Sequence, residues 1–281
     1  MALLDMVATG AETLPLEIDK KDIIVAHFRH NIRDKAAGNR DEEIIGRACA
    51  RYGLKCVVGE SHDLGENSSE EQARTERYAF LNKVGRESGD NYVVATAHHQ
   101  DDLLETALMN LIRGTGWRGL APMANSPHHL RPLLGLSKAE ITAYAINHGL
   151  TWQDDVTNFS PHYFRNRVRD MVAGLDAQKR RQLIELIGKQ MALREEIEPG
   201  VKHLADALAI QTKRGVEIRR YALIMLDADI ALELLRYLTR GRLTRPQLNR
   251  LLLFAKTAQP HKQMAWKDIH AQVATQYLLI C

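Results

Sequence analysis

Short apolar runs alternate with amphipathic segments along the first half of the chain, and this alternation constrains the fold more than any other feature. The apolar runs cover residues 22–27, 55–58 and 92–97. Each run is followed by a helical pattern, over residues 41–51, 70–87 and 101–113. Because strands that alternate with helices form βαβ units, the pattern predicts an α/β fold with a doubly wound parallel sheet.

The beginning of the chain departs from this alternation. Met1–Val7 has the pattern of a helix that opens a domain with no strand before it, so we expect the sheet to lack its first strand. A further helix is predicted over residues 137–148, where Ser137 and Glu140 form a capping box and Gly149 ends the helix.

The pattern becomes helical and charged after residue 169. We therefore expect a catalytic domain over residues 1–170, a helical linker over 171–215 and a small, mostly helical second domain over 216–281. Within the second domain, the sequence predicts two helices and a closing strand, over residues 228–240, 244–256 and 276–280.

Composition excludes some classes of protein but does not identify a partner. The chain has 281 residues, of which 45% are hydrophobic, so it can bury a sizeable core. Its net charge of +3 is too small to indicate nucleic-acid binding alone. The three cysteines, Cys49, Cys56 and Cys281, form no C-x-x-C pattern and favour reduced thiols in the cytoplasm. No apolar run is long enough to span a membrane. The oligomeric state stays open, a homodimer included.

The segment that follows the third apolar run carries the densest set of reactive side chains. His98, Asp102 and Glu105 are spaced by four and three residues, which places them on one face of a helix. Carboxylates at the edge of a parallel sheet suit Mg²⁺, and Asp102 and Glu105 are the candidate ligands. Alternatively, these acids only complement the helix dipole. His98 either donates to a phosphoryl or carbonyl oxygen or caps the end of the strand.

Two arginine-rich segments are candidates for phosphate contact. Residues 113–120 combine three glycines with two arginines, and Arg113, Gly114 and Gly116 are the candidate nucleotide-binding residues. Residues 163–169 place arginines beside aromatic rings, a combination that suits phosphate contact and base stacking. The alternative for the second segment is a charged helix start. Its candidate residues are Arg165, Asn166, Arg167 and Arg169.

Other polar residues are candidates for the same sheet edge. Arg74 and Arg77 on the helix over 70–87 point toward it in one interpretation, although an ordinary surface helix has the same pattern. Three residues at the end of the first strand could line the site: His27, His30 and Arg33. They are poor metal ligands as a group, because an arginine among them opposes a cation. Asp155 and Asn158 either bind a substrate ammonium group or form a turn.

Seven motifs, taken in order, resemble the tRNA(Ile)-lysidine synthases, a family of PP-loop ATP pyrophosphatases. They cover residues 1 to about 170, and no single one is specific. The motifs are Ala26-His27-x-x-His30-x-x-Arg33, Ala73-Arg74-x-x-Arg77-Tyr78, His98-His99-x-Asp101-Asp102-x-x-Glu105-Thr106, Arg113-Gly114-x-Gly116-x-x-Gly119-Leu120, Arg131-Pro132-Leu133, Trp152-x-x-Asp155-x-x-Asn158 and Arg165-Asn166-x-x-Arg169.

The resemblance implies an adenine nucleotide alpha hydrolase-like fold and a two-step reaction that uses ATP and Mg²⁺. ATP would adenylate the C2 oxygen of the wobble cytidine of the tRNA(Ile) with a CAU anticodon, and the amine of L-lysine would then displace AMP. The implied roles are metal and lysine positioning for Asp102 and Glu105, contact with the nucleotide or the activated base for His98, and phosphate contact for Arg74 or Arg77. Substrate or tRNA contacts are implied for Arg131, Asp155, Asn158, Arg165, Asn166, Arg167 and Arg169.

The chain departs from the family at its defining loop. The Ser-Gly-Gly-x-Asp-Ser loop, which cradles the pyrophosphate, should stand just before a helix like that of Met1–Val7, but no Ser-Gly-Gly occurs in the sequence. We therefore expect a shortened form of the enzyme that binds ATP poorly. Two alternatives remain open: a non-catalytic tRNA-binding remnant, and another PP-loop enzyme such as a tRNA thiolase.

Overall fold

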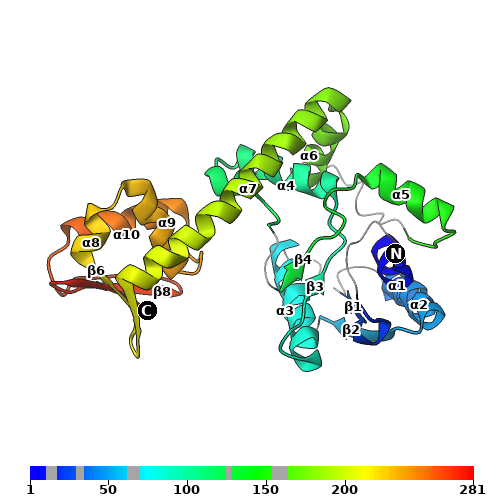
Figure 1. The fold of residues 1–281 in the computed structure, drawn as a ribbon, viewed down its shortest axis with the longest axis horizontal. Helices are drawn as coiled ribbons and strands as arrows, with labels where there is room; N and C mark the ends of the chain where they lie inside the picture. Colours follow the sequence, from blue (N-terminus) through cyan, green and yellow to red (C-terminus); the bar gives the residue numbers. More distant parts are fainter. Residues whose placement is uncertain (11–17, 30–34, 62–69, 125–127, 154–163) are drawn as a thin grey trace. The chain divides into compact units, whose positions relative to one another are not determined.

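The computed structural model describes residues 1–10, 18–29, 35–61, 70–124, 128–153 and 164–281. It divides the chain into two compact units (Figure 1). The first unit contains residues 1–113 and 122–185, and the second contains residues 114–121 and 186–281. The long helix α7 (Ala177–Leu208) contributes residues to both.

The first unit contains the α/β elements that the sequence predicts. Each predicted strand and helix is confirmed, with ends that shift by a few residues. The elements in chain order are α1 (Ala2–Thr9), the short 3-10 helix η1 (Lys20–Asp22), β1 (Ile24–Arg29), α2 (Lys35–Tyr52), β2 (Lys55–Glu60), α3 (Glu70–Ser88), β3 (Val94–Ala95), α4 (Gln100–Ile112), β4 (His129–Leu130), α5 (Lys138–Asn147) and α6 (Phe164–Ala173).

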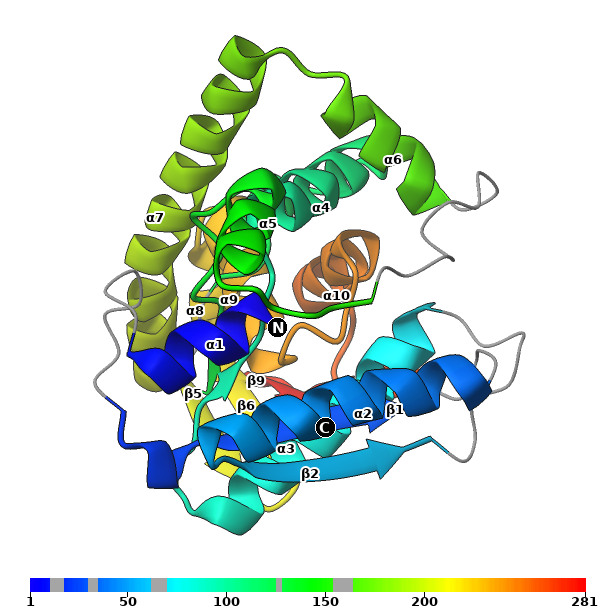
Figure 2. The same ribbon diagram turned by 90° about the vertical axis from the view of Figure 1, so that its right-hand side faces the viewer.

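The strands of the first unit pair in parallel, as predicted. β1 pairs with β2 with Ile24 opposite Lys55, and β3 pairs with β4 with Val94 opposite His129. Among the described residues, these pairs form two separate two-stranded sheets. Figure 2 shows α2 running alongside β1 and β2. The two-residue strand β4 was not predicted, because so short a segment carries no periodicity.

Helix α1 is held by a small apolar core and by one buried carboxylate. Met6 is 1% exposed and packs with Leu133. Asp5 lies on the same helix at 4% exposure. Its Oδ2 accepts a hydrogen bond of 2.7 Å from the Tyr144 hydroxyl, and its Oδ1 accepts one from the Tyr52 hydroxyl. Since Tyr52 ends α2 and Tyr144 lies on α5, Asp5 ties three helices together.

Helix α5 begins as the sequence predicts. The Ser137 hydroxyl accepts a hydrogen bond from the Glu140 amide, and the Glu140 carboxylate accepts one from the Ser137 amide. This capping box satisfies amides that lack partners in the first turn. Gly149 follows the helix with φ +60°, a conformation that glycine adopts without strain.

The second unit combines helices with a five-stranded antiparallel sheet of order β5-β6-β9-β8-β7. The predicted helices and closing strand of this part are confirmed as α9, α10 and β9, whereas the other four strands were not predicted. Its elements are η2 (Trp117–Leu120), β5 (Ala209–Thr212), β6 (Gly215–Arg219), α8 (Arg220–Met225), α9 (Ala228–Leu238), α10 (Arg245–Thr257), β7 (Gln263–Trp266), β8 (Ile269–Val273) and β9 (Tyr277–Ile280).

The helices and the sheet of the second unit bury one continuous apolar core. Leu234 of α9, Leu251 of α10 and Leu278 of β9 are all fully buried in it. Alternation along β8 explains why the sheet forms, because Ile269, Ala271 and Val273 face the core while His270 is exposed. In neither unit does a described helix have the length and apolarity needed to cross a membrane.

Candidate functional site

His98 lies in the loop that connects the parallel strand β3 to the helix α4. The helix begins at Gln100, so His98 precedes it instead of sharing a helical face with Asp102 and Glu105 as the spacing predicts. The Thr96 hydroxyl oxygen lies 2.8 Å from His98 Nδ1 and fixes the orientation of the ring. The contact leaves the other ring nitrogen, Nε2, without a hydrogen-bond partner among the described residues.

The surroundings of His98 keep its imidazole neutral. The pKa of His98 is lowered to about 4, chiefly by burial and also by Arg131, Arg74 and Arg77, while Asp102 opposes them. Three guanidiniums therefore act on one half-buried ring. Arg74 and Arg77 belong to α3, and Arg131 directly follows β4. We call this group, made of His98, Asp102, Arg74, Arg77 and Arg131, the His98 cluster.

The arginines of the His98 cluster are held in place by aromatic and backbone contacts. The guanidinium carbons of Arg74 and Arg77 lie 4.9 and 5.6 Å from the centre of the Tyr78 ring. Arg131 donates hydrogen bonds through Nη1 to the carbonyl oxygens of Met123 and Ala124, at 3.1 and 2.9 Å. Three positive charges thus act on one half-buried ring, which favours an anionic ligand nearby.

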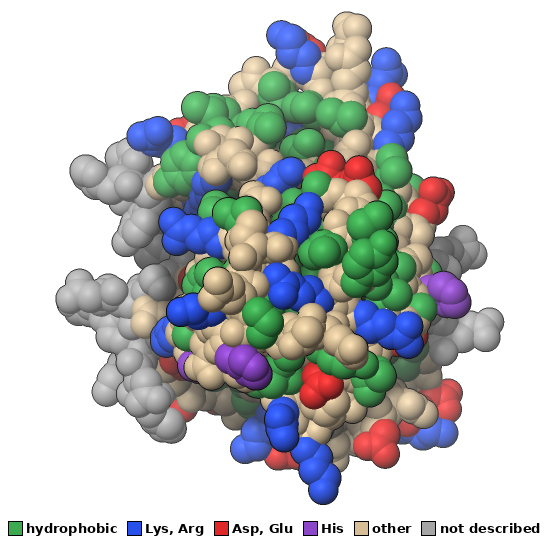
Figure 3. Space-filling model, turned by 90° about the vertical axis from the view of Figure 1, so that its left-hand side faces the viewer, with side chains coloured by type: hydrophobic (Ala, Val, Ile, Leu, Met, Phe, Trp, Pro, Cys, Tyr) green, Lys and Arg blue, Asp and Glu red, His purple; other side chains and the backbone are tan. Residues whose placement is uncertain are grey.

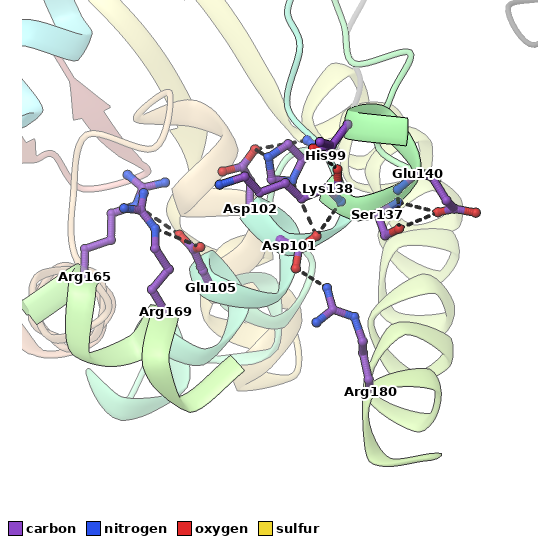
Figure 4. A network of polar contacts seen from close by, with 11 residues as sticks. His99, Asp101, Asp102, Glu105, Ser137, Lys138, Glu140, Arg165, Arg169 and Arg180 are labelled. Carbon is purple, nitrogen blue, oxygen red and sulfur yellow. Dashed lines mark hydrogen bonds and ion pairs between the residues drawn. The ribbon is translucent and has the colours of Figure 1, made fainter. Parts of the chain in front are cut away.

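The carboxylates at the start of α4 stabilise the local structure. Asp102 accepts a hydrogen bond of 3.0 Å from the His99 amide and so caps the first turn of α4 (Figure 4). This structural role is an alternative to a catalytic one. Asp101 accepts a hydrogen bond of 2.8 Å from the Lys138 amide and pairs with Arg180 of α7. Burial would raise the pKa of Asp101, but these two partners outweigh it and lower the pKa.

Glu105 contacts α6 and not the His98 ring. The residue is 3% exposed, and its oxygens lie 3.3 Å from Arg165 Nε and 3.2 Å from Arg169 Nε. Figure 4 shows both arginines reaching from α6 toward this carboxylate. Two guanidiniums at one carboxylate oppose a bound cation, and the described residues contain no group of three metal-ligating side chains. Glu105 in this arrangement therefore does not fit as a Mg²⁺ ligand, whereas the role of Asp102 as a ligand stays a prediction.

The described part of the arginine-rich segment, residues 164–169, is helical, the alternative that the sequence left open. Arg165 and Arg169 share one face of α6, whereas Arg167 is exposed on another face, 5.9 Å from the Phe164 ring. Arg113 approaches the same ring at 5.7 Å. Asn166 accepts a hydrogen bond of 3.4 Å from Arg169. Arg113 and Arg167 thus offer exposed guanidiniums beside the Phe164 ring.

The remaining predicted residues lie in other parts of the chain or outside the described residues. Gly114 and Gly116 belong to the second unit. His27 is half-buried on β1, where burial lowers its pKa, Asp41 and Glu42 oppose that effect, and Arg29 adds to it. The predictions for four others lie outside the described residues: His30, Arg33, Asp155 and Asn158.

Sequence reasoning missed three residues that organise the site. Thr96 orients His98, Tyr78 supports two arginines, and Asp101 joins α4 to α5 and α7. The signal for Asp101 was its position in the first helical turn next to Asp102. Thr96 gave no signal, because a single threonine at a strand end is common.

Comparison with known proteins agrees with this architecture. Residues 1–175 match the family described as the PP-loop domain. The chain is 38% identical over 162 residues to the bifunctional protein TilS/HprT of Listeria monocytogenes, which covers 54% of this chain and 24% of that protein. It is 37% identical over 156 residues to the tRNA(Ile)-lysidine synthase of Geobacter sulfurreducens, which covers 53% of this chain and 33% of that one.

A longer match joins the chain to the tRNA(Ile)-lysidine synthase of Bacteroides thetaiotaomicron, at 33% identity over 204 residues. It covers 67% of this chain and 43% of that protein, so the chain spans less than half the length of these relatives. Among solved structures, the U34-tRNA thiolase NcsA from Methanococcus maripaludis has the same fold, with a TM-score of 0.56, 18% identity, and 70% of this chain and 69% of that chain covered.

These matches confirm the resemblance to the tRNA(Ile)-lysidine synthases. The family match covers more than half of the chain and contains β1 to β4, α3, α4 and the whole His98 cluster. The parallel strands, the helix that follows β3 and the gathered arginines are thus parts of one recognised architecture, and the chain belongs to the PP-loop family.

Proposed function

We propose that the chain is the ATP-dependent catalytic part of a tRNA(Ile)-lysidine synthase. In the first step, the C2 oxygen of the wobble cytidine in the tRNA(Ile) with a CAU anticodon attacks the α-phosphorus of ATP, and pyrophosphate leaves. In the second step, the amine of L-lysine attacks C2, and AMP leaves. The observation that carries this proposal is the His98 cluster within a chain whose relatives bear this name.

The arginines of the cluster supply the electrostatic part of the first step. Negative charge grows on the phosphates as pyrophosphate departs, and guanidiniums stabilise it best where water is scarce. Arg74, Arg77 and Arg131 meet this need, because they converge from two elements on a half-buried ring. Each arginine is also held by contacts within the protein, so little reorganisation is required when ATP binds.

His98 supplies a neutral imidazole at the same place. Since burial lowers its pKa to about 4, it carries no charge near pH 7 and does not add to the repulsion among the arginines. With Nδ1 engaged by Thr96, Nε2 contacts the nucleotide or the activated base. Asp102, the acid of the cluster, is the candidate to attract the lysine ammonium before the amine attacks. Mg²⁺ takes no part in these two steps as proposed, because Glu105, one of its two candidate ligands, is paired with Arg165 and Arg169.

The other regions take supporting roles in this proposal. The first unit binds ATP, the helical linker joins the units, and the second domain contacts the tRNA. The exposed arginines beside Phe164 contact phosphate or a base. Three cysteines without a C-x-x-C pattern support a location in the cytoplasm. A non-catalytic tRNA-binding protein is the second candidate, because the exposed arginines beside Phe164 suit RNA contact without a chemical step.

The test is lysidine formation on a tRNA(Ile) transcript. The chain is incubated with ATP, labelled L-lysine and the transcript, and label on the tRNA is measured together with pyrophosphate release. A second version carries an added N-terminal strand and a Ser-Gly-Gly-x-Asp-Ser loop. We expect little product from the chain alone and ready turnover by the extended version.

Two controls make the result specific. A transcript with a GAU anticodon should accept no lysine, and the His98→Ala variant of the extended version should lose at least about 100-fold in rate, the usual range for a positioned polar group. If the extended version binds tRNA but incorporates no lysine, the catalytic proposal fails and the tRNA-binding candidate stands.

A further inference from the structure

The second unit contains a cavity of about 790 Å³ between α7, α9 and the strands β5 and β6. Four arginines line it: Arg118, Arg194, Arg236 and Arg240. The acids that line it are Glu198 and Asp206. This cavity is distinct from the His98 cluster, because all of its lining residues belong to the second unit.

Two of the four arginines are neutralised by glutamates. Arg118 donates through Nε to Glu233 at 2.6 Å and through Nη1 to Glu198 at 2.9 Å. Arg194 donates through Nε to the same Glu198 at 2.7 Å. Burial would raise the pKa of Glu198, but Arg194 and Arg118 outweigh it and lower the pKa. The glutamate is therefore ionised and shared by these two arginines through one oxygen, Oε1.

The other two arginines have no carboxylate partner. Neither Arg236 nor Arg240 forms an ion pair with any residue that the structure describes. Arg236 Nε is buried and makes no hydrogen bond there. Burial lowers the pKa of Arg236, and the nearby Arg118, Arg245 and Arg194 lower it further, with only Glu233 opposing. A buried donor that is surrounded by like charges is stabilised when an anion binds.

The backbone at the end of α9 presents Arg240 in an unusual conformation. Arg240 has φ +53°, a left-handed value that a side chain with a Cβ rarely adopts, and Gly241 follows with φ +69°. This turn places Arg240 at the same cavity as Arg236, four residues earlier in the chain. Figure 3 shows that Lys and Arg side chains are numerous on the side of the molecule where the second unit faces the viewer.

We propose that this cavity binds a phosphate group through Arg236 and Arg240. Guanidinium groups match phosphate oxygens with two parallel hydrogen bonds, and a volume of about 790 Å³ is far larger than a single ion needs. The phosphate belongs either to the backbone of an RNA strand or to a free nucleotide. The use of tRNA as the RNA in the test rests on the proposed function, whereas the binding of a phosphate group does not.

The experiment measures binding by the full chain in the absence of ATP. Labelled tRNA is titrated at several KCl concentrations, and inorganic phosphate is titrated separately with thermal stability as the readout. The variants are Arg236→Gln, Arg240→Gln and the double variant. Arg250→Gln is the matched control, because Arg250 is exposed on α10 and does not line the cavity.

We expect the double variant to bind tRNA at least about tenfold more weakly. The slope of log affinity against log salt should become less steep by about 1 for each phosphate contact that is lost. Arg250→Gln should leave the affinity and the slope unchanged. A loss of tRNA binding alone identifies RNA as the source of the phosphate. A loss of stabilisation by inorganic phosphate as well identifies a free phosphate ligand.

The proposal is overturned if the double variant binds tRNA and inorganic phosphate as the unaltered chain does. It is also overturned if the unaltered chain binds neither. If Arg236→Gln fails to fold, the exposed Arg240→Gln variant decides the question. Failure to form lysidine leaves this result unaffected, because the binding assay contains neither ATP nor lysine.

Discussion

At the scale of single residues, His98 should make the stability of the protein depend on acidic pH. Its folded pKa is lowered to about 4, whereas the unfolded ring titrates near 6.5. Between these values the unfolded chain binds more protons, so stability is full above pH 6.5 and falls as the pH decreases toward 4. Urea unfolding at pH 7 and pH 5 measures the loss.

The His98→Gln variant provides the comparison for that titration. Glutamine keeps a polar group beside Thr96 but binds no proton in this range. The variant should therefore lose less stability than the unaltered chain between pH 7 and pH 5. Equal losses in both proteins would show that His98 titrates as an ordinary exposed histidine.

Burial should also make the cysteines differ in reactivity. Cys49 is 2% exposed, and burial raises the pKa of its thiol to about 11. Cys281 is exposed. Because the thiolate is the reactive form, a maleimide at pH 7.5 should label Cys281 at least about 100-fold faster than Cys49. Mass spectrometry of timed digests measures both rates, and similar rates would contradict the packing of α2.

At the scale of elements, Glu105 joins α4 to α6. Replacing it by Gln leaves Arg165 and Arg169 without their carboxylate, and we expect a loss of about 2 kcal/mol because both arginines are partly exposed. The control is Glu43→Gln, which breaks the exposed pair with Arg47 on α2 and should cost less than about 0.5 kcal/mol. Equal costs in urea unfolding would assign no structural role to Glu105.

The junction of α1, α2 and α5 should weaken at high pH. Burial and the hydrogen bond to Asp5 raise the pKa of Tyr144 to about 12, and the hydrogen bond to Asp5 also raises that of Tyr52. The stability that these hydroxyls contribute is present below pH 10 and is lost as the pH rises toward 12. The Tyr144→Phe variant should lose less stability over that range, as followed by circular dichroism in urea. An equal loss would mean that the Asp5 hydrogen bond contributes nothing.

At the scale of the whole molecule, the sequence predicted the helices and strands but not which side chains from distant segments come together. The alternation of apolar and amphipathic segments predicted the helices and the parallel strands, because each repeats over many residues. The spacing of His98, Asp102 and Glu105 did not predict their neighbours, since His98 precedes α4 and Glu105 contacts α6. Interactions between distant segments, such as the electrostatic effect of Arg131 on His98, depend on the folded chain and have no local signal.

The division into two units predicts that a core defect stays local. Leu251 is fully buried in the core of the second unit, while Leu253 on the same helix is 60% exposed. Leu251→Ala should cost about 2–5 kcal/mol through the lost contacts and the cavity, and Leu253→Ala should cost almost nothing. Hydrogen exchange should then rise across α9 and α10 in the first variant but stay unchanged in α1 and α2, because these helices pack in the other unit. If exchange rises equally in α1 and α2, the units unfold as one cooperative body, and the second unit does not have a core of its own.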